Sequence, residues 1–467
     1  MQEIRTPGMQ NVVLSEKTLA DYAPVVGAEV IAELERLARP LQGARVLHIS
    51  STAYGGGVAE MLHTLIPLMR SAGLDAQWRT IPGNDEFFTV TKSMHNALQG
   101  MDLDLTPAMR AAYLHANVDY AMYFEDEFDY VIVHDPQPAP LRSLRRTDPG
   151  KWIWRCHIDL TAANQQYWNF LRPFVEAYDA AIFTMPQYVK NDLSIEKIAI
   201  VPPAIDPLSP KNAPMEDARA AEIVGMYGVD PERPLLVQVS RFDPWKDPLG
   251  VIDAYRAVKR KYPDVQVALI GSMAHDDPEG MEYYQRTKEH AGADPDIHLL
   301  SNLDGVGNVE VNAFQRAATV VLQKSLREGF GLTISEGLWK NKPVIGGNVG
   351  GIPLQIQEGV TGYLVESVDG CVRRILDLMA DPQRAAAMGA RGREEVRLNF
   401  LSTANLRNYL NLFNELAGNA VVSKKGQGKS SDKAARAGKT AATARGSQSD
   451  RARQDAGRSV ARSASAH

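Results

Sequence analysis

The chain has 467 residues, and 44% of them are hydrophobic. A chain of this length exceeds what one hydrophobic core usually serves, so two domains are expected. Its formal net charge of −5 is uneven, because residues 421–467 hold 11 Lys and Arg against 3 Asp, a net +8 that leaves −13 for residues 1–420. An acidic body of this kind argues against nucleic-acid binding.

The ends of the chain and its cysteines bear on location. Cys156 and Cys371 lie far apart without metal-ligand spacing, which is typical of a reducing cytoplasm. The sequence shows no secretory signal pattern and no apolar run of bilayer-spanning length, so we expect a soluble, cytoplasmic protein without stable membrane association. Residues 421–467 lack apolar periodicity and are predicted to form a disordered basic tail, a solubilising extension with RNA or membrane association as the lesser alternative.

Strand-like and helical stretches alternate along the body, which is typical of parallel sheets with crossover helices. Five prolines between Pro202 and Pro214 interrupt this alternation and mark a domain boundary. We therefore predict an α/β chain of two doubly wound, Rossmann-like domains, residues 1–206 and 207–395, with a cleft between them and a helix over 396–420 crossing back over the first domain. The predicted strands cover 45–50, 76–81, 130–134, 152–157, 180–184, 198–201, 235–240, 265–271, 297–301, 319–323, 344–346 and 362–365.

A glycine-rich loop follows the first of these strands. Gly55, Gly56 and Gly57 precede a helix that is predicted to begin near Val58, and consecutive glycines let the backbone approach a ligand closely. A dinucleotide fingerprint would need a third glycine where Glu60 stands, and no Walker-type lysine follows. The loop is either a ligand-binding turn or only a flexible one.

A histidine followed by an acid marks two strand ends of the first domain. His134 and Asp135 end one strand, and His157 and Asp159 follow another. At the carboxyl edge of a sheet such pairs are well placed to bind sugar hydroxyls, although histidines at strand ends also satisfy backbone carbonyls.

The second domain offers a cationic pair. Arg241 and Lys246 follow its first strand, and together they could neutralise a diphosphate. A departing nucleoside diphosphate gains negative charge in the transition state, so this grip would accelerate transfer. The alternative is a surface pairing of the two cations with Asp243 and Asp247.

Two glutamates flank a second glycine-rich loop. Glu328 and Glu336 enclose Gly-Phe-Gly between a buried strand over 319–325 and a helix that starts at 332. Helix-start N–H groups attract anions, and the carboxylates accept sugar hydroxyls. The alternative is a solvated turn with a glutamate that caps the helix.

No metal-binding motif stands near these residues, so we expect metal-independent chemistry in which Arg241, Lys246 and helix dipoles supply the positive charge. A hydrolase with two carboxylates is an alternative, but it would not need a cationic diphosphate grip.

Taken together, the Glu328–Glu336 segment, the cationic pair and the glycine loop resemble retaining glycosyltransferases of family 4, with the GT-B fold, over about residues 40–418. The segments 51–60, 133–138, 155–159 and 202–207 are similar to trehalose-forming members, which couple a nucleoside-diphosphate glucose to glucose and give α,α-trehalose.

The resemblance assigns roles to single residues. It implies that Arg241, Lys246, Glu328 and His157 carry catalysis, and that Glu336 binds the donor ribose. It also implies front-side attack through a short-lived oxocarbenium-like ion pair, without a protein nucleophile. The implied acceptor ligands are His134, Asp135 and Asp159, and the implied donor ligands are Gly55, Gly56, Gly57, Gly329, Phe330, Gly331, Leu332, Thr333 and Glu336.

The expected partners are therefore small molecules: the nucleoside-diphosphate glucose, glucose and trehalose. No cofactor is expected, Mg²⁺ could stimulate without being required for binding, and a homodimer is left open. A retaining trehalose phosphorylase and a non-catalytic GT-B binding protein stay as alternatives.

Overall fold

The computed structural model describes residues 8–419 except 55, 125, 146–147 and 274–277. Gly55 and the predicted disordered tail lie outside these described residues. Within the described part of the chain, no helix is both long and apolar enough to cross a bilayer.

The first half of the chain forms a seven-stranded sheet with strand order β1-β3-β2-β4-β5-β6-β7. All neighbours are parallel except β1, which pairs with β3 in the antiparallel sense. The central strand β4 is buried along its whole length, as expected for a parallel sheet covered on both faces. The strands are β1 Gln10–Asn11, β2 Arg45–Ser50, β3 Asp75–Thr80, β4 Tyr130–His134, β5 Lys151–Arg155, β6 Ala180–Phe183 and β7 Lys197–Ile200.

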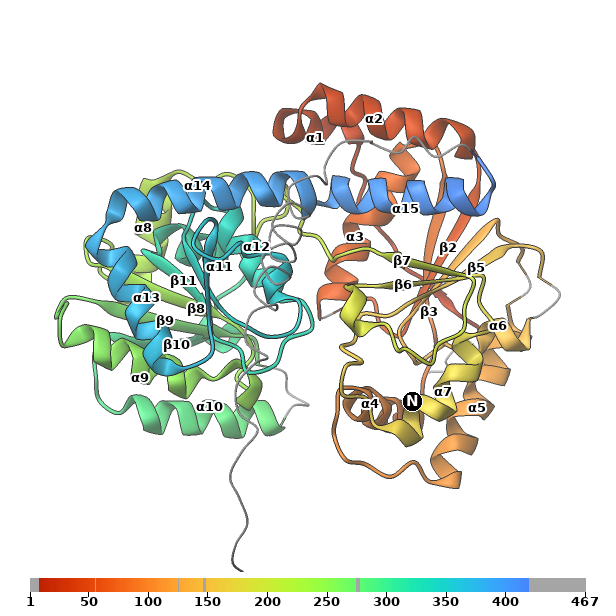
Figure 1. Cartoon of the computed structure of the whole chain (residues 1–467), viewed down its shortest axis with the longest axis horizontal. Helices are drawn as coiled ribbons and strands as arrows, with labels where there is room; N and C mark the ends of the chain where they lie inside the picture. The colour runs from red at the N-terminus through yellow and green to blue at the C-terminus, as the bar shows by residue number, and fades with distance from the viewer. Residues whose placement is uncertain (1–7, 55, 125, 146–147, 274–277, 420–467) are drawn as a thin grey trace, which may run out of the picture. The chain divides into compact units, whose positions relative to one another are not determined.

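The second half forms a six-stranded, wholly parallel sheet with strand order β10-β9-β8-β11-β12-β13 (Figure 1). Each sheet is doubly wound, because the chain moves outward in one direction and then returns to the other side of its starting strand. The strands are β8 Leu235–Val239, β9 Gln266–Gly271, β10 Ile297–Ser301, β11 Val320–Gln323, β12 Val344–Gly347 and β13 Gly362–Val365.

Helices connect the strands of both sheets. Those of the first half are α1 Leu19–Val26, α2 Ala28–Ala38, α3 Gly56–Ser71, α4 Asp85–Leu98, α5 Pro107–Met122, α6 Leu141–Leu144 and α7 Gln165–Val175. Those that follow are α8 Asp217–Met226, α9 Pro248–Lys259, α10 Pro278–Ala291, α11 Asn308–Ala317, α12 Leu332–Trp339, α13 Val368–Ala380, α14 Pro382–Asn399 and α15 Ser402–Leu416.

The winding of the sheets positions the candidate site. Chain direction reverses between β2 and β4 in the first sheet and between β8 and β11 in the second. Open α/β sheets bind ligands at such switch points, outside the carboxyl ends of the strands. The loops that leave these four strands carry the glycine loop, Asp135, the Arg241–Lys246 pair and the Glu328 loop. The switch points therefore place most of the predicted residues at ligand-binding edges.

The two-sheet α/β fold is confirmed, and all twelve predicted strands are present with ends shifted by at most two residues. Strand β1 was not predicted, because two exposed polar residues, Gln10 and Asn11, give no periodic signal. The domain boundaries at 206/207, 395/396 and 420/421 stay predictions.

The predicted crossing helix is two helices. Helix α14 ends at Asn399, and Leu401 has an extended backbone, with φ −90° and ψ 157°, before α15 begins at Ser402. Here the Ile205 N–H donates to the Phe400 carbonyl at 2.9 Å, and Ser402 N–H donates to the Ile205 carbonyl at 3.0 Å. The continuous helix over 396–420 was therefore wrong, since backbone pairing with the proline-rich segment interrupts it.

Helix α15 lies against α2 and α3 of the first half, as the apolar stripe predicted (Figure 1). The Tyr130 hydroxyl donates to the Phe413 carbonyl at 3.0 Å, and the Asn414 side chain donates to the Leu37 carbonyl at 2.8 Å. The end of the folded chain is thus part of the first half's packing.

Gly389 sets how closely α14 approaches the chain that follows α12. A Cβ at this position would lie 1.9 Å from the Asn341 carbonyl oxygen, whereas a Cβ on Gly225 in α8 would meet nothing within 4 Å. We expect Gly389→Ala to lower the free energy of unfolding by about 2 kcal/mol through overpacking. Gly225→Ala, the matched control, should raise it by up to about 1 kcal/mol. Urea denaturation measures both, and equal shifts would contradict the close approach.

Candidate active site

The Glu328 loop exposes a run of unpaired backbone donors. Among the described residues, the N–H groups of 329–333 meet no hydrogen-bond acceptor. Gly331 adopts the left-handed conformation, with φ 80°, and α12 begins directly after it. These N–H groups together with the start of α12 form an anion-binding arrangement.

The carbonyls of the same loop are all used. The Tyr188 hydroxyl donates to the carbonyls of Gly329 at 2.5 Å and of Glu328 at 3.3 Å. The Gln355 side chain donates to the Phe330 and Gly331 carbonyls at 2.6 and 3.3 Å. Because the carbonyls are held and the N–H groups are not, the loop is fixed in an orientation suited to a ligand that accepts hydrogen bonds.

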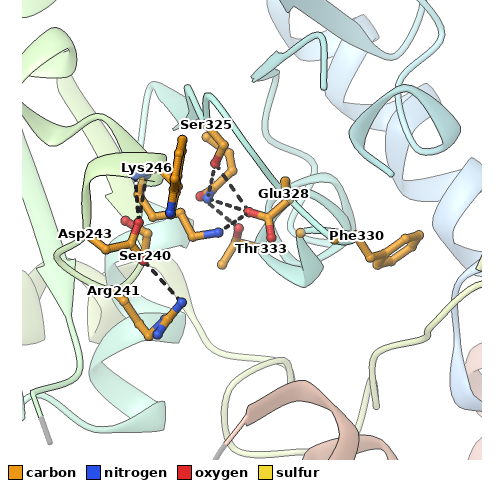
Figure 2. Close-up of polar contacts among 12 residues, drawn as sticks. Ser240, Arg241, Asp243, Lys246, Ser325, Glu328, Phe330 and Thr333 are labelled. Carbon is orange, nitrogen blue, oxygen red and sulfur yellow. Dashed lines mark hydrogen bonds and ion pairs between the residues drawn. The ribbon is translucent and has the colours of Figure 1, made fainter. Parts of the chain in front are cut away.

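The Glu328 carboxylate is held by one of its two oxygens. Oε2 accepts from Lys246 Nζ at 2.7 Å, from Gln323 Nε2 at 3.3 Å and from the Ser325 hydroxyl at 3.3 Å (Figure 2). Gln323 is oriented by the Thr333 hydroxyl, which donates to its Oε1 at 2.9 Å. The described residues give no hydrogen bond to Oε1, so that oxygen stays available to a sugar hydroxyl.

The two predicted cations take different directions. Lys246 reaches Glu328, while the Arg241 guanidinium pairs with Asp243 at 3.2 Å and has 68% of its side chain exposed (Figure 2). Burial and Arg241 together lower the pKa of His95 on α4, so Arg241 faces that helix of the first half. The surface-pairing alternative thus holds for Arg241 with Asp243, but not for Lys246. Asp247 pairs instead with Lys324.

Glu336 lies inside the protein rather than at its surface. Its side chain is 1% exposed, with Oε1 3.4 Å from Lys211 Nζ and Oε2 accepting from Gln315 at 3.2 Å. Burial alone would raise the pKa of Glu336, but Lys211 and Lys340 outweigh it and hold the pKa below its ordinary value. Lys211 also donates to Glu60 on α3 at 2.9 Å. Lys211 therefore joins an acid of each half.

The glycine loop meets the start of α12. A Cβ on Gly57 would lie 3.0 Å from the Leu332 side chain, and Gly56 has φ 76°. Gly57 therefore packs against the side chain of Leu332, the residue with which α12 begins. The Phe330 ring points away from the polar cluster and lies 5.8 Å from the Phe400 ring, so only the backbone of this residue faces a ligand (Figure 2).

The two predicted acids of the first half, Asp135 and Asp159, are each held by a backbone N–H group. Asp135, in the left-handed region with φ 63°, accepts from the His157 backbone N–H at 2.8 Å, and burial raises its pKa to about 7. Asp159 accepts from the Thr161 N–H at 2.9 Å. Burial, followed by the charges of Asp159 and Glu328, raises the pKa of Tyr188. The carboxylates of Asp159 and Glu328 therefore lie near the Tyr188 hydroxyl.

His157 also reaches the loop, since its carbonyl lies 3.6 Å from where a Cβ on Gly329 would be. His134 does not. It is 1% exposed, and its two ring nitrogens bond to His48 and His157 at 2.9 Å each. The expectation that His134 binds the acceptor directly does not fit this geometry, because neither ring nitrogen is left for a sugar.

Several residues that hold the site were not predicted. Tyr188, Gln323 and Gln355 orient the Glu328 loop, Lys211 holds Glu336, and His48 contacts His134. A weak signal existed for Gln323, a polar residue at the end of a buried apolar strand. Lys211 stands among prolines, where no pattern singles it out.

Comparisons with known proteins identify the family of this chain. Residues 48–190 match the family model described as the N-terminal domain of trehalose synthase, and residues 221–395 match that of glycosyl transferases group 1. The chain is 51% identical over 415 residues to a trehalose synthase of Rubrobacter xylanophilus, covering 88% of this chain and 100% of the relative. The chain belongs to the trehalose synthase family of glycosyltransferases.

Further trehalose synthase relatives include one from Pyrococcus horikoshii, 48% identical over 86% of this chain and 97% of the relative. A trehalose phosphorylase of Pleurotus pulmonarius is 28% identical over 78% of this chain and 56% of the relative. Among solved structures, a UDP-forming trehalose-phosphate synthase from Burkholderia xenovorans superposes with TM-score 0.63 at 16% identity, covering 81% of this chain and 100% of that one. This likeness confirms the GT-B fold, and family membership makes the protein a glycosyltransferase that acts on sugars or nucleotide sugars.

Lys211 should be needed for stability because it neutralises the buried Glu336. We expect Lys211→Met to lower the free energy of unfolding by about 3 kcal/mol, since it leaves that carboxylate underpaired. Lys197→Met removes an exposed pair with Glu415 and should change it by about 0.5 kcal/mol or less. Urea denaturation compares the two variants, and equal losses would show that Lys211 contributes no more than a surface charge.

Proposed function

We propose that this trehalose synthase family member transfers glucose from a nucleoside-diphosphate glucose to glucose, with retention of configuration, to form α,α-trehalose. The observation that carries the proposal is the run of unpaired N–H groups over 329–333 beside Lys246.

The diphosphate is the ligand that this run suits best. Five N–H groups and the positive end of α12 offer hydrogen bonds to phosphate oxygens, and Lys246 adds charge. Arg241 adds charge when its guanidinium exchanges Asp243, its partner at 3.2 Å, for a phosphate oxygen. Negative charge on the phosphate increases as the glycosidic bond breaks, so these groups bind the transition state more strongly than the ground state. We propose that they make a metal unnecessary for donor binding.

The glucosyl group then lies among Glu328, Asp159 and His157. Glu328 Oε1 accepts a sugar hydroxyl, while Lys246 keeps the carboxylate in place through Oε2. Asp135 and Asp159 bind the acceptor. Glu336 accepts a hydroxyl of the donor ribose at Oε1, where that hydroxyl competes with Lys211. The distance between Lys211 Nζ and Glu336 Oε1, 3.4 Å, is long for an ion pair.

As in the family mechanism, no side chain acts as a nucleophile. The acceptor hydroxyl attacks on the face that the diphosphate leaves, and a phosphate oxygen takes the hydroxyl proton. The anomeric carbon of the transferred glucose forms a bond to the acceptor oxygen and loses its bond to the phosphate oxygen. The nucleoside diphosphate leaves as the second product and carries the proton of the acceptor hydroxyl, so atoms and charge balance.

A trehalose phosphorylase is the second candidate, because the same N–H groups would hold inorganic phosphate and the Pleurotus relative has that name. The two candidates differ in the leaving group.

Product analysis separates them. Purified protein is incubated with each of several nucleoside-diphosphate glucoses plus glucose, and separately with trehalose plus inorganic phosphate. We expect α,α-trehalose, identified by NMR of its anomeric protons, in the first reaction, with activity retained in EDTA. Glucose 1-phosphate from the second reaction, with no disaccharide from the first, would establish the phosphorylase instead.

Arg241 tests the charge argument. Removing one charge-assisted contact made in the transition state lowers the rate by about 100-fold or more, on the order of 3 kcal/mol. We expect Arg241→Ala to lower kcat/KM by this amount. Arg219→Ala, which removes an exposed arginine paired with Glu222, is the control and should keep wild-type turnover. Steady-state kinetics measure both, and an Arg241 variant as active as the control would refute the assignment.

A further inference from the structure

Three histidines form a hydrogen-bonded ladder that leads from the candidate site into the first half of the protein. His48 lies on β2, His134 ends β4 and His157 follows β5. His48 Nδ1 lies 2.9 Å from His134 Nε2, and His134 Nδ1 lies 2.9 Å from His157 Nε2. The rings are stacked, with centroids 5.2 Å apart in each pair. His48 is 0% exposed and His134 1%, so the ladder is closed to solvent at its inner end.

All three rings are neutral at physiological pH. Burial lowers the pKa of His48 to about 3. Burial, with neighbouring histidines and Arg155, lowers the pKa values of His134 and His157 well below the ordinary value. A neutral imidazole has one N–H and one bare nitrogen. The ladder therefore has two hydrogen arrangements, one in which every N–H points inward and one in which every N–H points outward.

The inner end distinguishes these arrangements. His48 Nε2 is buried and meets no hydrogen-bond partner among the described residues, and the Tyr409 ring centroid lies 5.7 Å from that of His48. The Tyr409 hydroxyl is likewise buried and unpaired. So are the Nε and Nη1 atoms of Arg155, which lies near enough to Tyr409 to oppose the rise that burial causes in the pKa of Tyr409. Arg155 is a hydrogen-bond donor only, and its register partner across β4 and β5 is His134.

An inward N–H on His48 would compete with the Arg155 donors for one acceptor, the Tyr409 hydroxyl oxygen, and would leave the hydroxyl hydrogen without a partner. A bare Nε2 would instead accept from Tyr409 or from a bridging water, and an orphaned buried acceptor is also tolerated better than an orphaned N–H. The surroundings favour the outward arrangement.

We propose that His48 and His134 are positioning residues that fix the hydrogen of His157 on Nδ1. In this arrangement His48 Nδ1–H donates to His134 Nε2, and His134 Nδ1–H donates to His157 Nε2. His157 then presents Nδ1–H, for which the described residues supply no acceptor, as a fixed donor to a hydroxyl oxygen of the donor glucose. The last step rests on the proposed function, while the hydrogen arrangement does not.

The test reads the hydrogen position and the activity separately. Protein labelled with ¹⁵N-histidine is studied by NMR without substrate, and the His157 signals are assigned from the spectrum of His157→Gln. We expect a protonated Nδ1 and a bare Nε2 on His157 in the wild type. A bare Nδ1 would overturn the proposal, whatever reaction the enzyme catalyses.

A matched pair of variants tests the ladder itself. His48→Asn places an amide N–H near the former Nδ1, so His134 keeps its donor, and we expect the wild-type His157 spectrum and near-wild-type turnover. His48→Leu removes that donor, so the hydrogens should redistribute to His157 Nε2, with kcat/KM lowered about tenfold, the effect of about one hydrogen bond. Melting temperatures identify a variant that fails to fold. In that case the His157 signals of the wild-type protein still test the proposed hydrogen position. Identical His157 spectra for two folded variants would overturn the role of His48.

If neither assay in the preceding subsection gives product while the wild-type His157 carries its hydrogen on Nδ1, the proposed function fails and the ladder stands.

Discussion

The rest of the candidate site depends on the five backbone N–H groups of residues 329–333, which meet no acceptor among the described residues. Unpaired backbone donors are unfavourable unless water or a ligand satisfies them. The protein keeps them unpaired by fixing the opposite side of the same loop. Tyr188 and Gln355 hold the carbonyls, and Gly350 permits a close approach, since a Cβ there would lie 1.6 Å from the Glu328 carbonyl oxygen. The arrangement is thus built into the fold before any ligand binds.

The charged side chains around this loop are paired with one another. Binding of the donor substrate would replace some of these pairs with contacts to the substrate. Lys246 pairs with Glu328, and Lys211 bridges Glu336 and Glu60. A phosphate group near Lys246 would share the charge of that lysine, while Glu328 would retain Gln323 and Ser325 as donors. Because Lys211 holds α12 to α3, a ribose on Glu336 would act on the helix that begins with the glycine loop.

Sequence alone predicted the parts of the molecule that follow from periodicity and chain order. The twelve strands have clear apolar runs, and parallel topology then places Glu328, Lys246 and Asp135 at strand ends. Directions of side chains were not predictable in this way. Arg241 and Lys246 are five residues apart on one loop, yet one pairs outward with Asp243 and the other inward with Glu328.

Other features were missed because they depend on contacts between distant segments. The break at Leu401 arises from pairing with Ile205, and neither residue signals it by type. His48 sits within an ordinary strand, and only the register of β2 with β4 brings it to His134. Glu336 follows the family spacing, but its burial beneath Lys211 is set by a segment more than 100 residues earlier.

The two halves of the site differ in charge in a way that suits glucosyl transfer. In the proposed reaction the second half would offer cations and N–H groups to the phosphate, whereas in the first half burial and Arg155 lower the pKa values of His134 and His157 and so favour their neutral forms. An oxocarbenium-like glucosyl group carries positive charge, which an imidazolium at His157 would oppose. A neutral His157 with its hydrogen fixed on Nδ1 would bind a sugar hydroxyl without that repulsion, and the carboxylates of Asp159 and Glu328 both contribute to the raised pKa of the neighbouring Tyr188. In the proposed reaction the buried ladder would thus provide a neutral hydrogen-bond donor where a charged donor would slow glucosyl transfer.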